Sequence, residues 1–313
     1  MREPEPPQEA SPSILIEPST GRPVLVAPQR QRRPKLALDP SAGPCPFCPG
    51  AEQQTPPEVD AVRVAGSRGD GPGWRARAFP NKYPAAANHE VVVEGGRHCQ
   101  QPGELDESIW ADSIAIWQRR IRAIEGRPGV ACGFLFKNVG APAGASIVHN
   151  HSQILGLPEL PPRLRLEQER AAAMDRCPWC AALEHADAEQ RMIVRAPAHA
   201  VLAPQVPRLP HETWVLPLDC HDDFLSTDLV SLASALHQLF RAVQQGLDNP
   251  AFNLWLHRVP GAAFHWHFEL QPRTSQLAGL ELGGELSINS VPPAQSAARL
   301  RQALDVSPRA TAR

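Results

Sequence analysis

The chain has 313 residues, and its 31 basic and 33 acidic side chains give a formal net charge of −2. A chain of this length can form one large or two smaller domains with a substantial core. A charge this close to zero gives no support for nucleic acid or an anionic membrane surface as a partner. No apolar run reaches the roughly 20 residues that a membrane helix requires. The acidic, proline-rich start lacks the apolar segment of a secretory signal, so we expect a cytoplasmic protein.

Proline and cysteine are the informative residue types. The 35 prolines predict many irregular connections. Four of the seven cysteines form two CxxC pairs, Cys45/Cys48 and Cys177/Cys180. Without a secretory signal, metal binding explains these pairs better than a disulfide framework. Residues 1–12 and 305–313 are polar and lack periodicity, so we expect disordered tails there.

The first CxxC pair opens a unit whose elements can be predicted in chain order. A β-like run over 89–94 follows it, and His98 comes shortly after. A helix is predicted from about Asp106, because the apolar residues Trp110, Ile114, Trp117, Ile121 and Ile124 recur at helical spacing. A strand over 133–138, a loop of small residues and a strand carrying His149 and His151 complete the unit.

The second CxxC pair opens a unit with the same order of elements. A strand-like run over 212–216, a helix from about 226 to 247 and a strand over 252–258 precede His265 and His267. We therefore predict an α+β fold made of a duplicated unit, with helices packed on antiparallel sheets. The N-terminal half is expected over 13–170 and the C-terminal half over 171–304.

Each unit also offers the donors of a tetrahedral metal site. A CxxC turn can bring two thiolates to one zinc ion, and two later histidines complete the shell. The first predicted set is Cys45, Cys48, His98 and His149, and the second is Cys177, Cys180, His221 and His265. The alternative is that either CxxC is only a buried turn or a redox pair.

The HxH pattern at His149 and His151 predicts a reactive centre. Residues i and i+2 of a strand point to the same face, so one histidine can bind metal while the other meets substrate. The preceding small-residue loop lets backbone N–H groups approach an anion, and Ser146 and Gln153 add donors. A neutral histidine is a competent nucleophile toward phosphorus when its second ring nitrogen is held by a hydrogen bond.

Several motifs resemble the galactose-1-phosphate uridylyltransferase family. They are residues 91–98, 136–146 and 278–289, together with His149-Asn-His-Ser-Gln153. That family is a branch of the histidine-triad superfamily with a duplicated fold and ping-pong nucleotidyl transfer. It includes members that resemble ADP-glucose phosphorylase.

The resemblance implies roles for particular residues. His151 would be the nucleophile that forms a covalent nucleotidyl-histidine, and Ser146 and Gln153 would hold the phosphates. The first metal site would usually hold zinc. Residues expected along the nucleotide and its phosphates are Arg30, Arg33, Asn81 and Asn138, and Glu281 would approach the sugar.

The second half has two competing interpretations. Zinc would use the second Cys/His set, whereas some family members bind iron, for which the donors here would be Glu167, His257, His265 and His267. Both sets include His265, and we favour zinc because it gives Cys177 and Cys180 a role. His267 lacks a glutamine two residues later, so no second nucleophile is expected.

The expected function is UDP-glucose:galactose-1-phosphate uridylyltransferase, acting on a nucleotide sugar and a sugar 1-phosphate in galactose metabolism. The alternative is an ADP-glucose phosphorylase with phosphate as acceptor, because the Ser after His151 and the second CxxC are reminiscent of adenylyl-handling members. A zinc-stabilised nucleotide-binding protein without turnover is a third hypothesis, from another class. The family tends to form dimers, which makes a homodimer a candidate state.

Overall fold

Ten strands form one antiparallel sheet in the order β3-β4-β5-β7-β6-β11-β12-β10-β9-β8. The computed structural model describes residues 13–28, 30 and 44–305, so residues 1–12 and 306–313 of the predicted tails lie outside it. In chain order the strands are β3 (Asp60–Arg63), β4 (Trp74–Pro80), β5 (Asn88–Glu94), β6 (Cys132–Val139), β7 (His151–Leu157), β8 (Met192–Arg195), β9 (His199–Leu202), β10 (Thr213–Pro217), β11 (Phe252–His257) and β12 (His267–Pro272).

The order of strands is the same when it is followed inward from either edge of the sheet. One half runs β3, β4, β5, β7, β6, and the other runs β8, β9, β10, β12, β11. The halves join where β6 pairs with β11, with Asn138 opposite Asn253. The expected α+β fold is therefore confirmed, with the two units sharing one continuous sheet. The proposed boundary between residues 170 and 171 stays a prediction.

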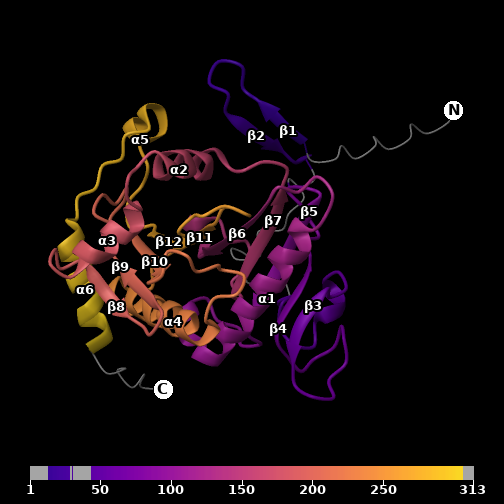
Figure 1. Ribbon diagram of the computed structural model, residues 1–313. Helices are drawn as coiled ribbons and strands as arrows, with labels where there is room; N and C mark the ends of the chain where they lie inside the picture. The colour runs from indigo at the N-terminus through magenta and orange to yellow at the C-terminus, as the bar shows by residue number, and fades with distance from the viewer. Residues whose placement is uncertain (1–12, 29, 31–43, 306–313) are drawn as a thin grey trace.

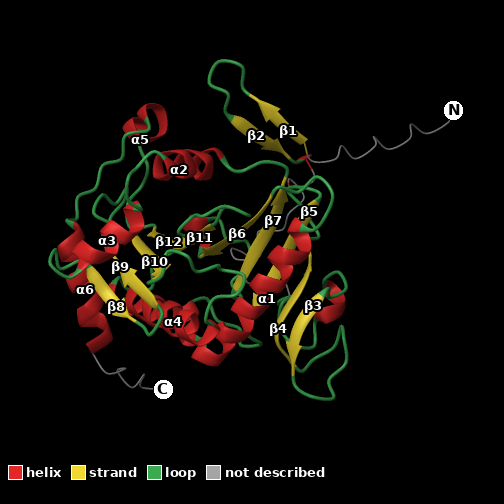
Figure 2. Cartoon of the chain, viewed as in Figure 1, coloured by secondary structure: helices red, strands yellow, loops and turns green. Residues whose placement is uncertain are grey.

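Six α-helices accompany the sheet in the described part of the chain, together with short 3-10 turns that include η5 (Ala141–Ala143). They are α1 (Glu107–Glu125), α2 (Pro162–Ala172), α3 (Pro178–Ala186), α4 (Leu229–Gly246), α5 (Gly279–Gly284) and α6 (Pro293–Asp305). Figures 1 and 2 show α1 and α4 as the two long helices, one associated with each half of the sheet.

The hydrophobic core lies between these two helices and the sheet. The predicted stripe of α1 is fully buried, including Trp110, Ile114 and Trp117. The Trp110 ring lies 4.7 Å from that of Phe240 on α4, which connects the two halves. Burial of each such side chain contributes roughly 2–3 kcal/mol, so this layer fixes the helices on one face of the sheet.

The other face of the sheet carries the predicted chemistry. On β7, Ser152 faces α1, because its hydroxyl accepts a 2.7 Å hydrogen bond from the Trp117 indole. Side chains alternate along a strand, so His151 and Gln153 point away from the helix layer. The strand period thus separates the core from the functional face.

A two-stranded hairpin, β1 (Ser13–Ile16) with β2 (Pro23–Val26), stands apart from the ten-stranded sheet. Figure 1 shows it at the same end of the molecule as α2 and α5. In the part of the chain that the structure describes, no helix is both long and apolar enough to cross a membrane.

Candidate active site and metal-ligand groups

A pocket of about 440 Å³ lies over the outer face of β7. The sequence-predicted residues Ser146, His151, Gln153 and Asn81 all line it. The rest of its lining comes from the first CxxC segment, the stretch around Thr55, strands β4 and β5, the turn after β4 and Ile147. These residues are Pro44, Pro46, Phe47, Gln53, Gln54, Thr55, Pro56, Phe79, Lys82, Tyr83, Val91 and Ile147. The structure therefore brings the expected nucleophile and its two expected partners together.

The His151 ring is oriented by the main chain just before β7. Its Nδ1 lies 2.8 Å from the main-chain carbonyl of His149. A carbonyl only accepts, so Nδ1 carries the proton and the lone pair of the neutral ring is on Nε2. Phe47, from inside the first CxxC turn, packs edge-on against the ring with centroids 5.2 Å apart. The ring therefore has a defined tautomer and orientation.

Gln153 is oriented by a chain of hydrogen bonds that begins at the backbone. Ala85 N donates to His89 Nδ1 at 2.9 Å, so His89 Nε2 carries the proton. That nitrogen donates to Gln153 Oε1 at 3.0 Å, and Asn81 Nδ2 reaches the same oxygen at 3.4 Å. Because its oxygen is held this way, Gln153 presents its amide N–H₂ as the donor end.

The arginines predicted near the nucleotide are only partly described. Arg30 is half-buried, and its Nη1 donates to the carbonyl of Tyr83 at 3.1 Å, beside the pocket wall. Burial lowers the pKa of Arg30 from its usual value, but a guanidinium remains charged in proteins. Arg33 lies outside the described residues.

Two further predicted substrate residues do not line this pocket. Asn138 lines a second pocket of about 340 Å³ over β6 and β11, and its Oδ1 accepts a 2.7 Å bond from Asn253 Nδ2. Glu281 lies in the short helix α5, where its carboxylate accepts from Ala278 N at 2.9 Å. Figure 1 shows α5 over the C-terminal half, away from β5 and β7.

The first predicted metal set is assembled as expected. Cys45, Cys48, His98 and His149 have ligand atoms that all lie within 4.8 Å of one another. His149 Nε2 contacts the carbonyl of Gly95 at 2.8 Å, which turns Nδ1 toward the sulfurs of Cys45 and Cys48 at 4.0 and 3.6 Å. His98 Nδ1 lies 3.3 Å from the Cys48 sulfur. The sulfur–nitrogen edge of a zinc tetrahedron is about 3.5 Å, so these donors fit a metal ion.

The second set is assembled only in part, and His221 stays a prediction as its fourth donor. Cys177, Cys180 and His265 form a three-member group, and His265 Nδ1 lies 3.5 and 3.7 Å from the two sulfurs. His265 Nε2 contacts the carbonyl of Pro217 at 2.9 Å, as His149 contacts Gly95. His221 is exposed and is not a member of this three-residue group.

The alternative iron set also needs correction at His265. The structure groups Glu167, His257 and His267 with Glu269, while His265 belongs to the cysteines. The two groups that the structure assembles therefore share no residue, although both predicted sets included His265. Glu167 contacts His257 Nδ1 at 2.6 Å, and Glu269 pairs with Arg163 at 3.1 Å and with Arg208.

Glu269 takes the place that Gln153 has in the first half, two residues after the second histidine of an HxH pattern. Burial opposes its ionisation. The bond from His267 and the charges of His257, Arg208 and Arg163 nevertheless hold the pKa of Glu269 well below its usual range. Two arginines thus engage this carboxylate.

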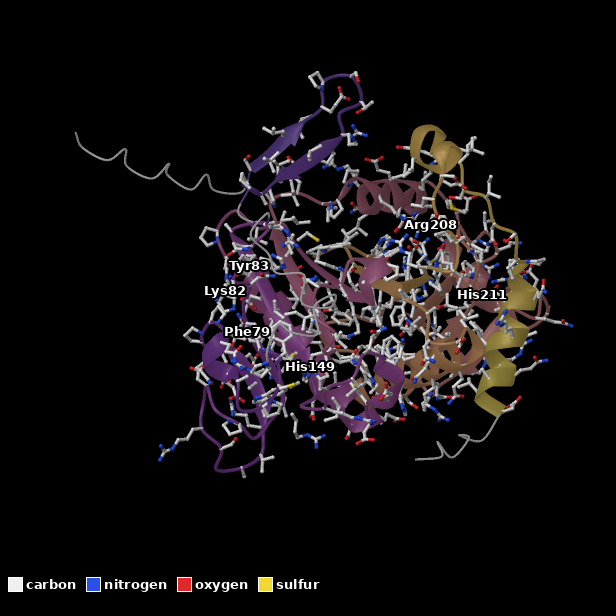
Figure 3. The ribbon with its side chains drawn as sticks, turned by 180° about the vertical axis from the view of Figure 1, so that it is seen from behind. Phe79, Lys82, Tyr83, His149, Arg208 and His211 are labelled. Carbon is white, nitrogen blue, oxygen red and sulfur yellow. The ribbon has the colours of Figure 1, made fainter. Side chains whose placement is uncertain are left out.

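Sequence reasoning missed some residues of the pocket and its support. Lys82 and Tyr83 follow Asn81 directly and line the pocket; the position of one of only three lysines beside Asn81 was an available signal. The buried pair of Lys137 with Glu94 gave no signal, because its partners are far apart in sequence. Figure 3 shows Phe79, Lys82 and Tyr83 together with His149 on one half, and Arg208 and His211 on the other.

Comparison with known proteins shows that the chain is similar, over nearly its whole length, to nucleotidyl-transferring enzymes. An ADP-glucose phosphorylase from Arabidopsis thaliana is 28% identical over 94% of this chain and 94% of its own length. A galactose-1-phosphate uridylyltransferase from Thermotoga maritima is 26% identical over 92% of this chain and 98% of its own. The crystal structure of an Arabidopsis thaliana ADP-glucose phosphorylase with bound ADP-glucose superposes with a TM-score of 0.73, covering 93% of this chain and 99% of that chain at 28% identity.

The chain belongs to the family described as a domain of unknown function (DUF4921), whose model matches residues 125–311. The relatives confirm the resemblance found in the sequence and the nucleotidyl-transferring class of enzyme that it implied.

Proposed function

We propose that this protein transfers a nucleotidyl group through a covalent intermediate on His151. The observation that carries the proposal is the fixed tautomer of His151 in a pocket that also contains Ser146 and the donor end of Gln153. Phosphoryl-type transfer depends mostly on positioning and on neutralising charge, and this pocket offers both.

In the first step, Nε2 of His151 attacks the α-phosphorus of a nucleotide sugar. A phosphorus–nitrogen bond forms, the bond from phosphorus to the bridging oxygen breaks, and the hexose 1-phosphate leaves with the electron pair. The proton on Nδ1 stays hydrogen-bonded to the His149 carbonyl, whose dipole stabilises the positive charge that the ring acquires.

In the second step, a phosphate oxygen of the acceptor attacks the same phosphorus and the phosphorus–nitrogen bond breaks. The neutral ring is restored, so one site serves two leaving groups in turn. Ser146 and Gln153 donate to the phosphate oxygens in both steps. Lys82 and Arg30 supply positive charge at the pocket wall.

We propose zinc as the ion of the first metal group. Two thiolates and two imidazoles form a closed shell, which is typical of structural zinc, where the ion supplies folding energy. Phe47 lies between Cys45 and Cys48 in the sequence and contacts the His151 ring. A zinc ion bound by the first metal group would therefore stabilise both this wall of the pocket and the start of β7. Iron at Glu167, His257, His267 and Glu269 is less favoured, because Arg163 and Arg208 already compensate the buried carboxylate.

Two donors remain candidates within this proposal. UDP-glucose with galactose 1-phosphate as acceptor is the first, and a uridylyltransferase relative supports it. ADP-glucose with phosphate as acceptor is the second, and it is supported by the relative named ADP-glucose phosphorylase. Either function places the protein in carbohydrate metabolism. We further propose a cytoplasmic location and leave a homodimer as a candidate state.

The test is the intact mass of the protein after separate incubations with UDP-glucose and ADP-glucose at neutral pH. A UMP adduct that galactose 1-phosphate discharges would support the uridylyltransferase. An AMP adduct that inorganic phosphate discharges would support the phosphorylase. His151→Gly should abolish either adduct, whereas the exposed His185→Asn serves as a matched control that keeps it.

Two results would count against the proposal. Labelling that survives in His151→Gly would show that another residue is the nucleophile. Folded wild-type protein that takes up no adduct from either donor would favour the nucleotide-binding protein without turnover.

A further inference from the structure

An amide pair connects the two halves of the sheet at their junction. Asn138 on β6 lies opposite Asn253 on β11, and Asn253 Nδ2 donates to Asn138 Oδ1 at 2.7 Å. The same nitrogen donates to the main-chain carbonyl of Ala143 at 2.9 Å. The Asn253 side chain is buried, at 9% exposure, and both of its N–H groups are used in these two bonds. One side chain of the C-terminal half thus holds two points of the N-terminal half.

Arg273 decides which way the Asn253 amide faces. Its Nε, which can only donate, contacts Asn253 Oδ1 at 2.6 Å. The amide nitrogen of Asn253 is therefore left for Asn138 and Ala143. A donor on that side requires Asn138 to turn its own oxygen toward Asn253, which leaves the N–H₂ of Asn138 as its donor end. The direction of the whole chain of hydrogen bonds thus starts from a guanidinium group, which has no acceptor.

Asn138 lies beside the proposed nucleophile. The Lys137 side chain is on the helix-facing side of the sheet, where it is ion-paired with Glu94. Side chains alternate along a strand, so that of Asn138 lies on the outer face, as does that of His151. Strand β6 pairs with β7 as far as Lys137 opposite Ser152, and the next residues at that end are Asn138 and His151. The N–H₂ of Asn138 is therefore available to a phosphate group bound at His151.

The second bond of Asn253 holds the loop that leads to Ser146. This loop starts at Gly140, which has a φ of +79° and lies so close to Ala251 that a Cβ atom there would come within 2.9 Å of the Ala251 side chain. The turn η5 ends at Ala143, whose carbonyl accepts from Asn253. Ser146 follows three residues later and lines the pocket over β7. The position of Ser146 thus depends on contacts with the C-terminal half.

The amide pair lies on one side of the two-fold relation between the halves. Phe136 and Trp255 mark the axis, because they occupy equivalent places in their strands and pair with each other. The amide pair is two residues from them in one direction. Two residues away in the other direction are Phe134 and His257. A phenylalanine has no donor or acceptor in its side chain, so the arrangement supports the half that contains His151.

We propose that Asn253 is a positioning residue for nucleotidyl transfer: it fixes the donor end of Asn138 and the loop before Ser146 around a phosphate at His151. The inference rests on the proposed function, and Asn253 itself does not contact the substrate. Phosphate oxygens only accept hydrogen bonds. An amide that presents its N–H₂ therefore stabilises the charge that develops during transfer, whereas one that presents its oxygen opposes it.

Asn253→Asp tests the direction of the amide chain. Aspartate keeps the shape of the side chain and its contact with Arg273, but it has no N–H to donate to Asn138 or Ala143. Asn138 then turns its nitrogen toward the aspartate and its oxygen toward the phosphate. We expect adduct formation on His151 to slow by at least about 100-fold, as when one donor is removed from a site that stabilises developing charge.

The rate and the final amount of adduct separate positioning from folding. Positioning predicts slower labelling that still reaches the wild-type amount. A loss of structure alone lowers the amount, while the remaining sites react at the wild-type rate. Gln271→Ala is the matched control, because Gln271 is a buried amide opposite Asn253 on β12 that donates to Glu212 instead. This control should label at the wild-type rate.

Hydrogen exchange of the loop over 140–146 provides a readout that needs no activity. In Asn253→Asp the loop loses its bond to the Ala143 carbonyl, so we expect its amides to exchange faster than in the wild type and in Gln271→Ala. If Asn253→Asp fails to fold, Arg273→Met tests the same chain from its other end. It frees the Asn253 amide to rotate, and both the slower labelling and the faster loop exchange are expected, with a smaller loss of rate.

Slower labelling to the full amount together with faster loop exchange supports the proposal. Labelling of Asn253→Asp at the wild-type rate overturns it, and so does a reduced amount of adduct that forms at the wild-type rate. Wild-type protein that forms no adduct refutes nucleotidyl transfer itself. In that case the positioning role falls with it, while the exchange of the loop still shows whether Asn253 holds Ala143.

Discussion

The buried ammonium group of Lys137 donates a 3.2 Å hydrogen bond to the main-chain carbonyl of His151. The same group is ion-paired with Glu94, and both side chains are at most 1% exposed. Burial lowers the pKa of Lys137, while the charge of Glu94 opposes this. Lys137, on the helix-facing side of β6, thus holds the backbone of His151 in place. The side chain of His151, the proposed nucleophile, lies on the opposite face of the sheet.

Removal of this lysine should destabilise the protein strongly. Lys137→Met leaves the Glu94 carboxylate buried without its cation, which we expect to lower the free energy of unfolding by about 3–5 kcal/mol. Urea denaturation measures the change. The double variant Lys137→Met/Glu94→Gln should recover most of the loss, and the exposed Lys82→Met should change stability by less than about 0.5 kcal/mol. Equal losses in the single and double variants would exclude a pairing role.

His89 should control the rate of transfer through Gln153, which it orients. His89→Ala frees the Gln153 amide to rotate, and we expect adduct formation on His151 to slow by up to about 100-fold. Rapid-quench labelling measures the rate, and zinc content should stay unchanged. His211→Asn is the matched control, because His211 contacts Ser296 in the other half. An unchanged labelling rate in His89→Ala would contradict a positioning role.

The first cysteine pair should determine metal content and thermal stability. Cys45→Ser removes one donor from the group of Cys48, His98 and His149, so we expect loss of one zinc equivalent and a lower melting temperature. Metal analysis and calorimetry provide the two readouts. Cys132→Ala changes a buried thiol outside the metal groups and should retain the metal. A Cys45→Ser protein with normal zinc content would disprove the first site.

Stability should fall in mild acid because of His199. Its ring is buried between Ser231 Oγ at 2.9 Å and Thr227 Oγ1 at 3.0 Å. Burial lowers the pKa of His199 from 6.5 to about 4. The unfolded chain therefore binds a proton first as the pH falls below about 6.5, and the folded state loses up to about 1.4 kcal/mol per pH unit until about pH 4.

The measurement compares urea unfolding of the wild type and His199→Gln between pH 7 and pH 4.5. The difference in unfolding free energy between the two proteins should shrink as the pH falls, because glutamine does not titrate. His185→Gln, at an exposed position, should keep the wild-type pH dependence. Parallel curves for wild type and His199→Gln would show that His199 does not contribute.

The sequence predicted most helices and strands of the repeated units and the first CxxC turn, because these depend on local spacing. The apolar stripe from Trp110 to Ile124 sets the buried face of α1, and alternation along β7 (His151–Leu157) sets the face on which His151 and Gln153 lie. The CxxC turn fixes two thiols within four residues. These features follow from the helix and strand periods, which can be read directly from the amino-acid sequence.

Long-range geometry could not be read in the same way. The sequence pattern added His221 to the second cysteine pair, but the tertiary structure groups that pair with His265 alone among the described residues. It also separated His265 from the carboxylate group and placed Asn138 in a different pocket from His151. Which donors converge depends on how strands from distant segments pair. A shift of one residue in that pairing changes the side chain that reaches the site.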